Sequence, residues 1–167
     1  MTGWFGRVGL PLTPEEYGAV SALLCSVAPE ATVSITRIPS WHEAAAFLGM
    51  AERDPTWWNQ EEEEREQLWE RAAEKLSESE LLRAVAAMTS GLDEQIRRAA
   101  SAAATAAGVI DAGIVDEASG MALLAAHQNA LAELAGERPD HRFILKYALW
   151  KAGRWPLGYH SARFAIF

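Results

Sequence analysis

The chain has very little cysteine and no long apolar segment. Cys25 is the single cysteine among 167 residues, so no disulfide can form within the chain. This usage fits a reducing compartment. No apolar run approaches the roughly 18–20 residues that a membrane-spanning helix needs, and the N-terminal stretch lacks the basic-then-apolar layout of a signal peptide. We therefore expect a soluble, cytoplasmic protein with no membrane partner.

Basic residues are also scarce. Fifteen Lys and Arg stand against 23 Asp and Glu, which gives a formal net charge of −8. Nucleic-acid binding relies on cationic side chains that neutralise phosphates, so this charge argues against a nucleic-acid partner. Solubility alone explains an acidic surface, but the charge would also speed association with a basic protein. A basic protein is thus the partner that charge favours.

The motifs of common enzyme families are missing. There is no Walker loop, dinucleotide-binding glycine fingerprint, GxSxG or HExxH. No two of the four histidines lie three or four positions apart, so no helical metal site can be read. We expect no metal and no cofactor, and we name no catalytic residue. An enzyme is the less favoured class of function.

Residues 93–136 are the most informative stretch for the fold. They are rich in alanine, the best helix former, and predict two helices joined near residues 108–113. Small side chains allow two helix backbones to approach closely, so this hairpin should be the central element. The expected inner ridge of its first helix is Ala99, Ala103 and Ala107. The expected inner ridge of its second helix is Ala118, Ala122, Ala126 and Ala130.

Start signals place five further helices. Capping boxes occur at residues 13–16, 40–43 and 77–80, where a Ser or Thr precedes a Glu by three positions. Asp54 before Pro55, and Pro139 before Asp140, indicate two more helix starts. Together with the hairpin, these signals predict about seven helices.

The strand signals are fewer. Residues 32–36 alternate polar and apolar side chains and are mostly β-branched, which is typical of a strand. Residues 163–167 also alternate, and residues 32–38 are their expected partner. Residues 154–159 read as a turn or short edge strand, and residues 4–9 as a weaker strand that would make the first helix a crossover between parallel strands. The sequence predicts a predominantly helical α+β fold in one domain, residues 1–167. It has about seven helices around the Ala-rich hairpin and a sheet of two to four short strands that includes the C-terminal strand.

Seven tryptophans are many for this length, and two of them suggest a surface. Trp57 and Trp58 are adjacent and point about 100° apart on a helix, so both rings are not expected to enter one core pocket. Beside Glu61 and Glu62 they have the composition of a binding anchor with a polar rim. The competing interpretation is that both rings cover the Ala-rich hairpin.

Two other groups are candidates for binding. Arg154, Trp155 and His160 surround a turn set by a proline and a glycine, which is either a rigid structural turn or a functional loop. His127 is one turn from leucines on both sides, which places it on a buried face. It is either a hydrogen-bonded core histidine or a histidine that faces a pocket.

Three functions remain open at this point. A protein-binding module, such as an adaptor, inhibitor or immunity-type protein, is favoured by the charge and the missing motifs. The first alternative is an enzyme or small-ligand-binding domain with a pocket near His127, the loop at residues 154–160 and Trp58. The second is a structural homo-oligomer, for example a homodimer. A cavity with perturbed titratable groups would favour the ligand-binding alternative, and a flat acidic face would favour the module.

Overall fold

The computed structural model describes residues 3–167, which form seven helices and three strands. In chain order they are α1 Pro14–Val27, β1 Ser34–Arg37, α2 Trp41–Ala51, α3 Thr56–Ala73, α4 Glu78–Thr89, α5 Leu92–Ala106, α6 Ala112–Ala135, α7 Arg142–Lys151, β2 Pro156–His160 and β3 Arg163–Ile166. The predicted class, a predominantly helical α+β fold, is confirmed. Among the helices of residues 3–167, none combines the length and the apolar character needed to cross a membrane.

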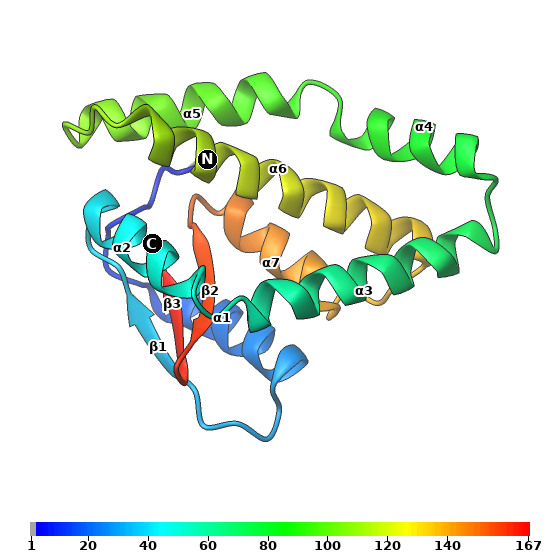
Figure 1. Ribbon diagram of the computed structural model, residues 1–167, viewed down its shortest axis with the longest axis horizontal. Helices are drawn as coiled ribbons and strands as arrows, with labels where there is room; N and C mark the ends of the chain where they lie inside the picture. The colour runs from blue at the N-terminus through cyan, green and yellow to red at the C-terminus, as the bar shows by residue number, and fades with distance from the viewer. Residues whose placement is uncertain (1–2) are drawn as a thin grey trace.

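Helix α6 lies at the centre of the helical part. It packs against α3, α4, α5 and α7, and Figure 1 shows α4 and α5 along one side of it and α3 and α7 along the other. The sheet, α1 and α2 gather at one end of these helices. The predicted inner ridge of α6 is confirmed, because all four of its alanines are buried: Ala118, Ala122, Ala126 and Ala130.

The inner ridge of α5 was predicted one position away from where it lies. The predicted alanines are half-buried or exposed, and the side chains that are buried are Ile96, Ala100 and Ala104. Ile96 buries much more apolar area than any alanine, so its burial sets the rotation of the helix about its axis. Because alanines lie on all sides of α5, they do not indicate which side of the helix is buried.

The sheet has the strand order β1-β3-β2. Strand β3 pairs in parallel with β1, where Ser34 faces Arg163 and Arg37 faces Ile166, and it pairs antiparallel with β2. The predicted pairing of the C-terminal strand with residues 32–38 is therefore confirmed. Strand β3 is the central strand and is buried over most of its length.

The predicted strand at residues 4–9 is wrong. These residues form successive turns, with Phe5 and Gly9 at positive φ, so α1 is not a crossover between strands. Glycines at positions 3, 6 and 9 make an extended ladder costly and turns easy. The segment is instead tied to the end of α7, where the Arg7 N–H donates to the Gly153 carbonyl over 3.0 Å.

Arg154, which follows α7, is fully buried and joins this N-terminal loop to α1. Its Nε and Nη2 donate to the two carboxylate oxygens of Glu16 over 3.0 and 2.7 Å. Its remaining N–H groups donate to the carbonyls of Arg7, Leu10 and Pro11 over 2.6 to 2.8 Å. All five guanidinium donors are thus used, which is what allows this charge to be buried.

Glu16 titrates far below its ordinary range. Burial would raise the pKa of this carboxyl, but hydrogen bonds from Arg154, Arg7 and the Thr13 N–H outweigh burial and lower the pKa from 4.5 to about 2. A carboxyl whose pKa falls on folding stabilises the fold above its unfolded pKa and loses that contribution as pH falls toward the folded pKa.

Glu16→Gln should therefore cost about 3 kcal/mol of stability at pH 6. The gap from the wild type should narrow as pH falls from 4.5 toward 2, because the wild-type carboxyl is then neutral as well. Urea denaturation across this range measures the gap, and Glu15→Gln, at an exposed neighbour, is the control. A gap that stays constant down to pH 2.5 would contradict the assignment.

Candidate functional site

Trp57 and Trp58 begin α3 and lie where that helix meets the sheet. Trp57 is buried, with its ring centre 5.8 Å from that of Phe164, and it packs directly on Gly158, where any β-carbon would meet its indole at 3.0 Å. Trp58 is half-buried. The adjacent rings thus differ in burial, as their 100° separation predicts, and the interpretation that both belong to the core holds for Trp57.

Both indoles line a cavity of about 250 Å³ between α3, α6, α7, β2 and the C-terminal end of α2. Its apolar wall combines the indoles with aliphatic side chains and a proline. The other residues that line it are Glu52, Glu61, Glu117, Met121, Leu124, Lys146, Trp150, Pro156 and Leu157. Leu124 of α6 is exposed and also lines this cavity, so it lies at the rim. The lining thus joins three helices, one strand and the residue that follows α2.

One side of the cavity contains a buried ion pair. The Lys146 ammonium lies 2.7 Å from both carboxylate oxygens of Glu61, and both side chains are buried. The Arg142 guanidinium is 3.6 Å from Glu61 and stacks over Trp57 at 4.8 Å. Burial lowers the pKa of Lys146, while the Glu61 carboxylate opposes that change. Glu61 therefore has its charge balanced within the protein.

Another side of the cavity is acidic without such a balance. Glu117 of α6 is half-buried, and its pKa is raised by burial and then by the nearby charge of Glu52. Glu52 caps the C-terminal end of α2, where the helix dipole disfavours a negative charge. Among residues 3–167, no ion pair involves either carboxylate. The half-buried Glu117 and the exposed Glu52 thus line one aromatic cavity, and neither has an ion-pair partner among residues 3–167.

Comparison with protein families, curated proteins and solved structures finds no match. The interpretation of this cavity therefore rests on its own chemistry.

The structure brings together only some of the predicted site residues. Trp57, Trp58 and Glu61 meet at the cavity, and the loop at residues 154–160 contributes Pro156 and Leu157. Glu62 is exposed and pairs with Arg65 outside it.

The other predicted residues lie elsewhere. Arg154 and Trp155 are fully buried in the core, and His160 is half-buried with its ring against Phe47. His127 is half-buried on α6 and does not line this cavity. The pocket predicted around His127 is therefore not the one that contains Trp58.

Three charged residues of the cavity were missed by sequence reasoning. Lys146 lies three positions after Phe143 and four before Trp150, which places it on the same apolar face of the helix. This spacing could have indicated a buried charge. Glu117 shares a helical face with Met121 and was readable in the same way. Glu52 follows α2 with no distinguishing pattern.

No metal site accompanies these carboxylates. Across the part of the chain that the structure describes, no three His, Cys, Asp or Glu side chains gather closely enough to hold a metal ion. The acidic side of the cavity instead faces indole and aliphatic groups, which metals do not use as ligands.

Lys146→Met should destabilise the fold by about 3 kcal/mol, because it leaves the Glu61 carboxylate buried without its closest partner. The double variant Glu61→Leu with Lys146→Met should recover much of this loss. Guanidinium denaturation measures both, and Lys151→Met, at the exposed end of α7, should change stability by less than about 0.5 kcal/mol. A Lys146→Met protein as stable as the wild type would refute the role of the pair.

Proposed function

We propose that this chain is a binding domain for a small organic cation, which enters the cavity of Trp57, Trp58 and Glu117. The observation that carries the proposal is the pair Glu117 and Glu52, two carboxylates that face an aromatic cavity with no counterion from residues 3–167. An ammonium group in the cavity would relieve their mutual repulsion. It would also supply an ion pair that residues 3–167 do not.

The rest of the lining suits the other parts of such a ligand. The face of the half-buried Trp58 attracts cations through its quadrupole, and this attraction strengthens where water is excluded. Leu124 and Met121 offer apolar contact to a hydrocarbon or ring. The lining holds three carboxylates and one ammonium, and the charge of −8 on the whole chain would concentrate cations near the surface.

The size of the cavity limits the ligand. At about 250 Å³ it is below the range of roughly 300–1,000 Å³ typical of drug-sized ligands. A monoamine with one ring or a short aliphatic group fits this size. A nucleotide or an oligosaccharide does not.

Titration calorimetry with two matched probes tests the proposal. Phenylethylammonium should bind and phenylethanol, its neutral isostere, should bind at least about tenfold more weakly, since it lacks the charge that meets the carboxylates. Glu117→Gln should lower the affinity for phenylethylammonium by about tenfold. Glu63→Gln, at an exposed position of α3 outside the cavity, should leave this affinity unchanged. Equal binding of the two probes, or no binding of either, would refute the proposal.

The affinity should also depend on pH. The raised pKa of Glu117 means that its carboxylate is protonated earlier than an ordinary Glu on acidification, so phenylethylammonium binding should weaken as pH falls. In Glu117→Gln this pH dependence should shrink. An unchanged pH profile in the variant would place the charge that binds the probe somewhere else.

A basic protein partner is the second candidate. It is supported by exposed carboxylates at i, i+4 and i+8 along α3: Glu62, Glu66 and Glu70. Such a complex would dissociate as salt is raised, and Glu117→Gln would leave it intact. These two responses separate it from binding in the cavity.

A further inference from the structure

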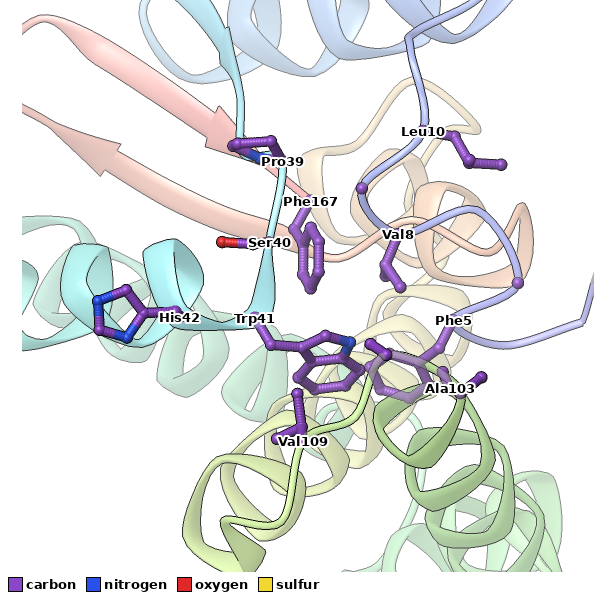
Figure 2. Close-up of a pocket in the computed structure, with 14 residues that line it drawn as sticks. Phe5, Val8, Leu10, Pro39, Ser40, Trp41, His42, Ala103, Val109 and Phe167 are labelled. Carbon is purple, nitrogen blue, oxygen red and sulfur yellow. The ribbon is translucent and has the colours of Figure 1, made fainter.

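The cavity of Trp57, Trp58 and Glu117 is called the cation site below. A second and larger cavity, of about 550 Å³, lies on the other side of the aromatic core. Phe5 lines this cavity and Trp150 lines the first, and the centres of the two rings are 5.4 Å apart. Figure 2 shows Trp41 and Phe5 on one side of the space, with Phe167 and Val8 opposite them. Its volume falls in the range of ligand pockets.

This cavity has almost no charge. Among residues 3–167, His42 is the one titratable side chain in its lining, and Figure 2 shows that ring turned away from Val8 and Phe167. Apart from the Ser40 hydroxyl, which accepts a hydrogen bond from the Glu43 N–H, the remaining lining is aromatic, aliphatic and backbone. An ionic ligand would lose its hydration here without gaining a partner, so the occupant must be uncharged.

One polar group inside this apolar lining has no partner. Trp41 is only 3% exposed, and its indole Nε1 makes no hydrogen bond within the described chain. Figure 2 shows the nitrogen-bearing edge of the indole turned toward Phe5 and Val8, beneath Phe167. The Phe167 ring, perpendicular to the indole at 5.4 Å, offers only a weak π acceptor. A buried N–H without a strong acceptor is costly. These side chains close the nitrogen off from the space, so a ligand with an oxygen acceptor would satisfy it once one of them turns aside.

The wall that carries Phe5 is held in place before any ligand binds. Phe5 has φ of 59°, a conformation that is unfavourable for a bulky side chain and persists only where the surroundings impose it. Arg154 holds the same loop by donating to the carbonyls of Arg7 and Leu10. Gly9 brings that loop so close to Phe167 and Pro39 that a β-carbon would lie 2.9 Å from the Pro39 oxygen. The ligand therefore need not order the backbone of this wall.

From these observations we infer that the cavity at Trp41 binds an uncharged, mainly apolar small molecule with one carbonyl-type oxygen, which accepts a hydrogen bond from Trp41 Nε1. The apolar body packs against Phe5, Val8 and Phe167. This site is separate from the cation cavity, and its ligand belongs to a different chemical class.

Two probes that differ only in the carbonyl test the inference. Indanone should bind the wild type roughly three- to tenfold more tightly than indane, as expected for one added hydrogen bond. In nitrogen-15 spectra, indanone should move the Trp41 indole proton downfield and indane should not. The signal that disappears in Trp41→Phe identifies this proton among the seven indoles.

The variants separate this site from the cation site. Trp41→Phe should bind the two probes equally, because it keeps an aromatic ring and loses the donor. Ala107→Trp, at an exposed lining position, should block both probes, and Glu117→Gln should block neither. An unmoved Trp41 proton, equal affinities in the wild type, or no binding would each overturn the inference. The comparison of affinities uses the wild type alone, so it stands even where a variant fails to fold.

Discussion

The buried guanidinium of Arg154 is the interaction on which the rest of the structure depends. It joins the N-terminal loop, the start of α1 and the end of α7, three segments that are distant in the sequence. The free energy needed to bury this charge is large, and it is offset because the Glu16 carboxylate and three carbonyls use every donor. A lysine has three donors on a single nitrogen and could not reach these acceptors together.

Part of the wall of each cavity is positioned by this arrangement. The loop that Arg154 holds presents Phe5 to the apolar cavity, while the residues that directly follow Arg154 lead into β2, which gives Pro156 and Leu157 to the cation cavity. The aromatic rings between them form one packed cluster, with Trp150 5.4 Å from Phe5 and 6.0 Å from Trp155. This cluster therefore separates the charged lining of one cavity from the mainly apolar lining of the other.

Local signals in the sequence were sufficient for the helices and for the pairing of the C-terminal strand. The capping box of Thr13 and Glu16 is present in the structure, and the alternation of residues 163–167 predicted a strand. Pairs of residues that meet only in the fold were not readable. Glu117 and Glu52 come from different helices, and Glu16 was read as a cap without its second role as the partner of Arg154. The rotation of α5 was also missed, because one isoleucine among many alanines decides it.

Amide hydrogen exchange in Arg154→Lys tests most directly whether this guanidinium positions the loop. The account predicts that the Arg7 amide, which donates to the Gly153 carbonyl, exchanges at least about tenfold faster in the variant, because the lysine cannot hold the carbonyls of the loop. The amides in the middle of α6, far from the substitution in sequence, serve as the internal reference. Unchanged protection of Arg7 in a folded Arg154→Lys protein would show that the loop is held by other contacts and would contradict the account.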